Sequence, residues 1–244
     1  MFPFRDHNPS ERTPYVTWAL IVANVAVFLG YFALLQDERA LAMFYNQWGL
    51  VPANASATTF VTSMFLHGGI MHLFGNMLFL YVFGDNMEDQ MGPVGFLGFY
   101  LVSGLVAAGA QFVADPASTI PMVGASGAIA GVMGGYLLMF PKARVDILII
   151  LIIIFRIIPV PAWLVLSGWF GLQLVQGSMT PTDMGGVAYW AHAGGFAAGL
   201  LMTVPLWQRR GGPAFWRRTD GQPPHPEAQY RMVRTSVPSV RRKR

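Results

Sequence analysis

The stretch GASGAIAGVMGGYLLMF, residues 124–140, decides how this chain folds. It follows an irregular segment that runs from Asp115 to Val123, and its apolar part begins at Gly127. A helix rises about 1.5 Å per residue, so about 14 residues span roughly 21 Å, whereas the hydrocarbon core of a membrane is about 30 Å thick. We therefore predict that Ser126 lies below the outer face of a membrane, next to backbone that is buried in protein or faces water.

The composition indicates a polytopic membrane protein. Of the 244 residues, 54% are hydrophobic and only 11% are charged, and the mean hydropathy is +0.45. The chain has no cysteine, which excludes disulfides and thiolate chemistry. We predict an all-α fold, a bundle of six membrane-spanning helices. Their expected ranges are 16–36, 70–87, 94–113, 126–140, 160–176 and 190–207.

The positions of Lys and Arg predict the orientation. With a cytoplasmic N-terminus, the external loops hold only Arg39, as expected when positive charge stays inside. We therefore expect an integral protein of a bacterial inner (plasma) membrane with both termini in the cytoplasm. Three parts follow: a cytoplasmic N-terminal segment (1–15), the six-span core (16–207) and a basic, Pro- and Arg-rich disordered tail (208–244). The cytoplasmic basic residues are Arg5, Arg12, Lys142, Arg144 and ten between Arg209 and Arg244.

Arg156 lies within the apolar run 147–160. An arginine deep in lipid costs several kcal/mol, which argues against a span that begins at the start of this run. Pro159 and Pro161 interrupt the run. We therefore expect residues 147–158 to form an interfacial segment and the fifth span to start near Val160.

Four polar residues are predicted to lie at one depth in the membrane. The second, fourth and sixth spans all run from outside to inside, so His72, Asn76, Ser126 and His192 fall near the outer ends of their helices. Small residues repeat at four-residue intervals on two of these helices, which allows their backbones to approach closely. Ser126 is therefore expected near His192. The repeating glycines are Gly127, Gly131 and Gly135 on the fourth helix and Gly195 and Gly199 on the sixth.

These residue types suit nucleophilic catalysis. A serine hydroxyl attacks a carbonyl only if a base takes its proton, and the imidazole of His192 titrates in a suitable range. The Ser126 backbone N–H, the Asn76 amide and His72 could bind the resulting oxyanion. Because no carboxylate is expected at this depth, the hypothesis is a Ser126–His192 dyad. The alternative for each polar residue alone is a hydrogen bond that holds two helices together.

At these positions the chain resembles the rhomboid family of intramembrane serine proteases. The motifs follow family order across residues 16–207. The matching pieces are Gly124-Ala125-Ser126-Gly127, His67 with His72-Leu73-Phe74-Gly75-Asn76, the series Gly84, Glu88 and Gly92, and Ala191-His192-Ala193-Gly194-Gly195 with Gly199.

The resemblance implies a role for each matched residue. Ser126 is then the nucleophile and His192 the general base and acid. His72, Asn76 and backbone N–H groups around Gly124 and Ala125 form the oxyanion site. The structural supports are His67, Glu88, Gly127, Gly131, Gly195 and Gly199.

The resemblance also implies the substrates. They are single-span membrane proteins, cut in or near the transmembrane segment, in an active site that opens toward the outer face. The expected surroundings are the lipid bilayer, with no cofactor, no metal and no nucleic acid.

Two positions depart from the family pattern. Ala130 stands four residues after Ser126, where some members have a tyrosine that packs beneath the histidine, so the means of orienting His192 is left open. Trp48 is followed by Gly49, where some relatives have a Trp-Arg pair. Neither departure removes a group that performs chemistry.

Other functions are possible for the same residues. A non-catalytic relative would bind transmembrane helices without cutting them. A small-solute transporter would use the histidines to carry protons, but it would leave the GASG motif unexplained. A metal site is disfavoured because His67 and His72 are expected to diverge around one helix. The loop 177–189 is either a gate over the site or a plain connector.

Overall fold

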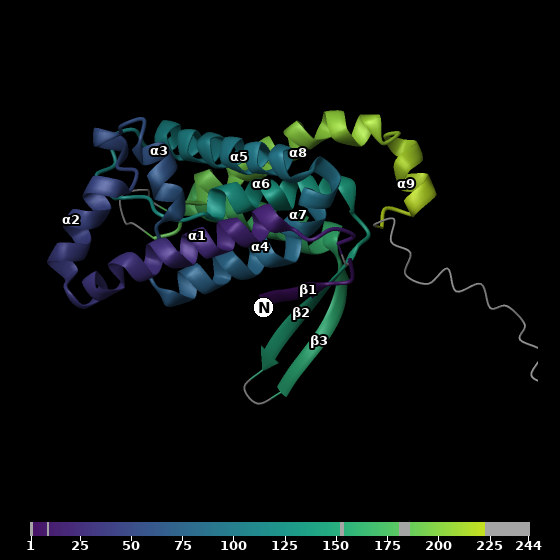
Figure 1. Cartoon of the computed structure of the whole chain (residues 1–244), viewed down its shortest axis with the longest axis horizontal. Coiled ribbons are helices and arrows are strands. Elements are labelled where there is room, and N and C mark those ends of the chain that lie inside the picture. Colours follow the sequence, from purple (N-terminus) through teal and green to yellow (C-terminus); the bar gives the residue numbers. More distant parts are fainter. Residues whose placement is uncertain (1, 9, 152–153, 181–185, 223–244) are drawn as a thin grey trace, which may run out of the picture.

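The computed structural model describes residues 2–8, 10–151, 154–180 and 186–222. Its main body is a bundle of helices that run along the long axis of the molecule (Figure 1). Each of the six predicted ranges coincides with one of these helices. They are α1 (Tyr15–Tyr31, extended by a 3-10 turn to Gln36), α4 (Ile70–Met91), α5 (Pro93–Ala114), α6 (Ser126–Met139), α7 (Ala162–Met179) and α8 (Tyr189–Arg209).

Helix α6 lies at the centre of the bundle. It begins at Ser126 and ends at Met139, where the backbone of Phe140 leaves the helical conformation. Nearly all of its residues are buried, and α8, α5 and α4 pack around it. Its many small residues explain this position, because helices without bulky side chains can be approached from several directions. The short helix therefore places its first residue inside the protein.

The segment between α1 and α4 covers the end of the bundle that holds the start of α6 (Figure 1). It contains helices α2 (Glu38–Trp48) and α3 (Thr59–Thr62) and short 3-10 turns at Pro52–Asn54 and Ser63–Phe65. Asp37 caps α2 by accepting hydrogen bonds from the N–H groups of Arg39 and Ala40. Tyr31 and Tyr45 both donate hydrogen bonds to the carbonyl of His67, which fixes this segment to the bundle.

A three-stranded antiparallel sheet lies toward the other end of the bundle, and the sequence did not predict it. The order is β1 (Phe2–Asp6), β2 (Arg144–Leu151) and β3 (Ile154–Pro161). The chain is mostly helical, as predicted, and the sheet is an addition that the all-α prediction did not include. The isoleucines and valines of β2 and β3 are β-branched residues, which favour strands. Pro159 and Pro161 fit an edge strand, because an edge strand can accommodate residues without an N–H donor.

When the helices of the structure are judged by their length and hydropathy, fewer of them qualify as membrane spans than the six predicted from the sequence. Among the described residues, Tyr15–Gln36 and Pro93–Ala114 are long and apolar enough to cross a membrane. A third span is counted if Thr59–Phe65 and Ile70–Met91, which meet at a 94° bend, are taken as one. The six-span count stays a prediction, since α6 is shorter than this criterion requires.

Part of the predicted tail is helical. Helix α8 extends to Arg209, and α9 (Pro213–Thr219) follows it, although the sequence suggested an irregular tail from residue 208. The aromatic rings of Trp207 and Trp216 lie 4.7 Å apart, and Phe215 is buried, so apolar contacts hold α9 in place. Residues 223–244 of the predicted tail, and 181–185 of the predicted loop 177–189, lie outside the described residues.

Candidate active site

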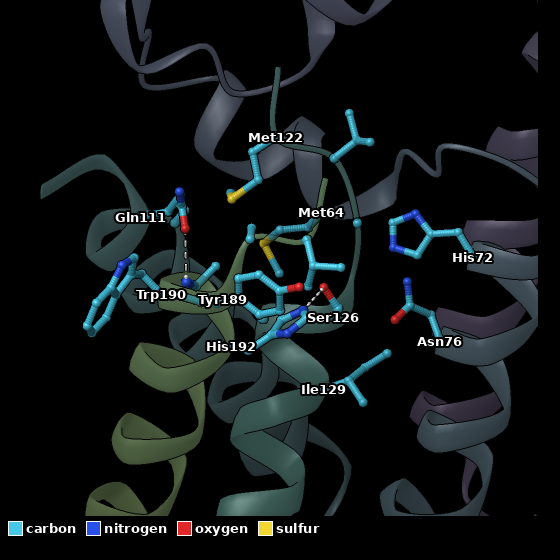
Figure 2. Close-up of a pocket in the computed structure, with 18 of the residues that line it drawn as sticks. Met64, His72, Asn76, Gln111, Met122, Ser126, Ile129, Tyr189, Trp190 and His192 are labelled. Atoms are coloured by element: carbon cyan, nitrogen blue, oxygen red, sulfur yellow. Dashed lines mark hydrogen bonds between the residues drawn. The ribbon is translucent and has the colours of Figure 1, made fainter. Parts of the chain in front are cut away.

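A cavity of about 480 Å³ opens between the helices at the start of α6. Helices α4, α5, α6, α7 and α8 all contribute to its walls, together with the irregular segment before α6. Figure 2 shows His72 and Asn76 on one side of this cavity and His192 on the other, with Ser126 between them. The fold therefore brings the four polar residues predicted from the sequence to one cavity.

Ser126 is positioned by the irregular segment that precedes it. This segment is held by hydrogen bonds rather than left open: Met122 forms a two-way backbone bridge with Leu50, and the N–H of Gly124 donates to the carbonyl of Ser63 at 2.9 Å. Gly124 has φ +136°, a conformation that favours glycine. Because Ser126 is the first residue of α6, its N–H belongs to the free donors at the positive end of the helix.

The side chains of Ser126 and His192 form a direct hydrogen bond. Ser126 Oγ lies 2.8 Å from His192 Nε2 (Figure 2). Helix α8 carries His192 in its first turn, and it packs against α6 through glycines. A Cβ at Gly195 would overlap the carbonyl of Gly127, and one at Gly199 would overlap the backbone of Gly131. The small residues therefore let the two helices approach closely enough for the hydrogen bond.

His72 and Asn76 present polar groups to the cavity from one face of α4. The N–H of Gly68 donates to His72 Nδ1 at 3.2 Å, so a neutral His72 ring carries its proton on Nε2. Asn76 is buried, and among the described residues its side-chain nitrogen has no hydrogen-bond partner. Asn76 thus has a donor without an acceptor among the described residues, and a neutral His72 has its own donor on Nε2.

Two residues that the sequence did not single out contact His192 from α7. Gln173 Oε1 lies 2.8 Å from His192 Nδ1, and the Trp169 ring lies 5.5 Å from the imidazole, centroid to centroid. Gln173 is only 5% exposed. A signal was present in the sequence, because a glutamine inside a predicted span is a polar group that needs a partner.

Two of the supporting residues, Glu88 and His67, do not line the cavity. Glu88 accepts hydrogen bonds from the N–H groups of Val16 and Thr17 and from the Thr17 hydroxyl, and so anchors the start of α1 on α4. His67 is fully buried, and its ring lies 5.2 Å from that of His72. The expectation that these two histidines diverge around one helix is wrong, because α4 begins only at Ile70, after His67.

In the part of the chain that the structure describes, no three His, Cys, Asp or Glu side chains are grouped so that they could hold a metal ion. The neighbours of His192 are a serine, a glutamine and a tryptophan. The arrangement around Ser126 is therefore suited to proton transfer between a hydroxyl and an imidazole.

These features define the class: an integral membrane protein with a serine–histidine pair at a cavity between its helices. Comparison with known proteins identifies the family. The model of the Rhomboid domain matches residues 54–209, which is more than half of the chain. The chain therefore belongs to the rhomboid family, which includes intramembrane serine proteases.

Similar proteins come from distant organisms. RHOMBOID-like protein 7 of Arabidopsis thaliana is 29% identical over 80% of this chain and 69% of its own length. Rhomboid protein 1, mitochondrial, of Saccharomyces cerevisiae is 32% identical over 76% of this chain and 51% of its own. A Bacillus subtilis protein named as a candidate rhomboid protease is 35% identical over 52% of this chain and 62% of its own. The chain thus spans between half and about two thirds of these relatives.

Proposed function

We propose that this protein is an intramembrane serine protease that uses Ser126 as nucleophile and His192 as general base and acid. The observation that supports it most strongly is the 2.8 Å hydrogen bond between Ser126 Oγ and His192 Nε2. This geometry is what proton removal from a serine requires. Family membership adds support, because rhomboids include serine proteases.

The chemistry proceeds in two stages. As Ser126 Oγ attacks the carbonyl carbon of the scissile peptide, its proton passes to His192 Nε2 and a tetrahedral oxyanion forms. The imidazolium then gives this proton to the leaving amine, and an acyl-enzyme remains. In the second stage His192 Nε2 takes a proton from the water molecule that attacks the ester carbonyl. It returns this proton to Ser126 Oγ as the bond between Oγ and the acyl carbon breaks, which releases the carboxylic acid product.

The oxyanion is bound by donors that surround Ser126. The Asn76 amide nitrogen, which has no partner among the described residues, faces the cavity from α4, and His72 offers Nε2–H. Backbone N–H groups at the start of α6 add the positive end of a helix. Gly124 and Ala125 shape this turn. Together these groups stabilise negative charge as it develops in the transition state.

The substrates are membrane proteins with a single transmembrane span. Their cleavage occurs in or near that span, because the cavity lies between membrane helices. An intact helix hides its carbonyls in internal hydrogen bonds, so a substrate must unwind locally before Ser126 can reach one. The protein lies in a bacterial inner membrane, with both termini on the cytoplasmic side and the cavity open toward the outer face. This orientation keeps nearly all positively charged residues on the cytoplasmic side.

Cleavage of a single-span model substrate by the purified protein in liposomes tests this function. Ser126→Ala and His192→Ala should each abolish cleavage while the protein stays folded. Ser178→Ala is the matched control, because this exposed hydroxyl on α7 donates only to the nearby Val175 carbonyl. Unchanged turnover in Ser126→Ala would overturn the mechanism, and a wild-type protein that binds the substrate without cutting it would favour a non-catalytic role.

Asn76→Ala tests the oxyanion site separately. Loss of one oxyanion donor lowers kcat by about 100-fold or more in serine proteases. We expect a decrease of that size with little change in KM, because the donor acts on the transition state. An unchanged kcat would reduce Asn76 to a residue that only holds helices together.

A further inference from the structure

We infer that Gln173 is the positioning residue for His192, and that it sets which ring nitrogen of the imidazole carries the proton. This inference rests on the proposed function, because it assigns the means by which the base is oriented. The observation is a continuous chain of contacts: Gln173 Oε1 lies 2.8 Å from His192 Nδ1, and His192 Nε2 lies 2.8 Å from Ser126 Oγ. Gln173 thus contacts the base on the side opposite the nucleophile.

The orientation of the Gln173 amide follows from a second contact. Its nitrogen donates to the carbonyl of Trp169, one turn earlier on α7, at 3.5 Å. Because a carbonyl can only accept, this contact turns the amide nitrogen toward Trp169 and the amide oxygen toward His192. That oxygen is itself only an acceptor. His192 Nδ1 must therefore carry a hydrogen, which leaves Nε2 of the neutral ring with a lone pair for the Ser126 hydroxyl.

The uncharged amide suits this position. Gln173 is 5% exposed and lies between membrane helices, where a buried carboxylate without a cationic partner is costly. In a Ser-His-Asp triad, an aspartate holds the same imidazole nitrogen. Here an amide provides the acceptor that fixes the tautomer, and it does so without a buried charge.

The same helix supplies the aromatic support of the ring. Trp169 lies four residues before Gln173, hence on the same face of α7, and its ring is tilted by 34° relative to the imidazole. At Ala130, where some rhomboids have a tyrosine, the side chain is fully buried. The structure thus supports His192 from α7 rather than from α6.

Three variants of the full-length protein in liposomes test this inference. Gln173→Met keeps the size of the side chain and removes the strong acceptor, whereas Gln173→Glu keeps an acceptor and adds charge. Gln176→Met makes the same change one turn away, at a residue that does not line the cavity. The readouts are kcat and KM for a model substrate, the pH profile of kcat, and the imidazole nitrogen NMR signals of His192.

We expect Gln173→Met to lower kcat by about 10- to 100-fold, a part of what a general base contributes, with KM within twofold of wild type. Gln176→Met should behave as wild type. Gln173→Glu should retain more activity than Gln173→Met. As the solution is acidified, the kcat of Gln173→Glu should begin to fall at a higher pH than the kcat of wild type, because a carboxylate stabilises the protonated ring of His192. In the NMR spectrum, the Nδ1–H form of His192 should dominate in wild type and lose this dominance in Gln173→Met.

The outcomes separate this inference from the proposed function. If wild type cleaves the substrate but Gln173→Met keeps the wild-type kcat, pH profile and His192 signals, the inference is overturned and the proposed function stands. If wild type cleaves nothing but Gln173→Met still loses the Nδ1–H form, the proposed function fails and the positioning contact stands. Equal loss of kcat in Gln176→Met would point to general damage to α7 and would also overturn the inference.

Discussion

His192 is held between two regions of very different packing. On one side, α8 meets α6 backbone to backbone, with Gly195 against Gly127 and Gly199 against Gly131. On the other side, α7 contacts the ring through side chains, and much of its surface is open: Trp163, Leu164 and Val175 are each at least 50% exposed. The hydroxyl and the imidazole are therefore carried by helices in close backbone contact, whereas the contacts to Nδ1 and to the ring face come from a peripheral helix.

The largest loss of stability should come from adding a methyl group between α6 and α8. In Gly199→Ala, the new Cβ would overlap backbone atoms of Gly131, and backbone cannot rotate away as a side chain can. Overpacking in a core typically costs about 1–3 kcal/mol and sometimes more, and here we expect the upper part of this range. Thermal unfolding in detergent and the yield of monodisperse protein would measure it.

The same substitution on α7 is the control. Gly171 has open space around the position of a new Cβ, so Gly171→Ala should leave the melting temperature unchanged or slightly raised. If both variants lose the same stability, the contact between α6 and α8 is not packed more tightly than the surroundings of α7.

Ala130→Tyr tests whether the α6 side has room for the aromatic ring that some rhomboids carry there. Ala130 is fully buried, so we expect a loss of about 1–3 kcal/mol from overpacking. Thermal unfolding would measure it. Leu172→Tyr, at a position on α7 that is 51% exposed, should be tolerated. A variant Ala130→Tyr that is as stable as wild type would show that the α6 side retains free space.

Trp169→Ala should affect the rate more than the fold. Contacts between aromatic rings contribute about 0.5–1.5 kcal/mol, so a His192 ring that loses this contact should give a kcat lower by roughly three- to tenfold. Trp163→Ala removes the same side chain from the same helix at a half-exposed position, so its kcat should not change. Equal kcat values for the two variants would mean that the Trp169 ring does not support the imidazole.

The last effect concerns Asp6, which contacts the far end of α6, and it is seen only as a dependence of stability on pH. The hydroxyl of Tyr136 donates to its carboxylate at 2.8 Å. Burial raises the pKa of Asp6 from 3.8 to about 8, and the nearby Asp85 adds to this, although the hydrogen bond from Tyr136 acts in the opposite direction. The folded protein therefore binds the proton more tightly than the unfolded chain. The contribution of Asp6 to stability is complete below about pH 4 and is lost as the pH rises toward 8.

Asp6→Asn removes this dependence, because an amide does not titrate in this range. We expect the melting temperature of the variant, relative to wild type, to rise by roughly 5–15 °C between pH 5 and pH 8. Differential scanning fluorimetry at several pH values would measure it. A constant difference across this range would contradict the raised pKa.

The residues that carry strong local signals were predictable from the sequence. Apolar length identified the helices, and the short helix after Ser126 placed that residue inside the bundle. The chain direction of alternate helices put His72, Asn76 and His192 at the same end. Family resemblance added the roles, which stay a proposal. The sheet was missed because an apolar run of β-branched residues reads equally well as a helix or as an interfacial segment.

The sequence by itself determined the helical class, the order of the helices and the place of Ser126 at the start of the short α6, because these depend on composition and length along one chain. Only the tertiary structure decided what holds His192. Gln176 carries the same sequence signal as Gln173, and Trp163 the same as Trp169. Which of them contacts the imidazole depends on how α7 is rotated and how closely it approaches α8. Such contacts between helices are set by packing of the whole bundle, which no local pattern records.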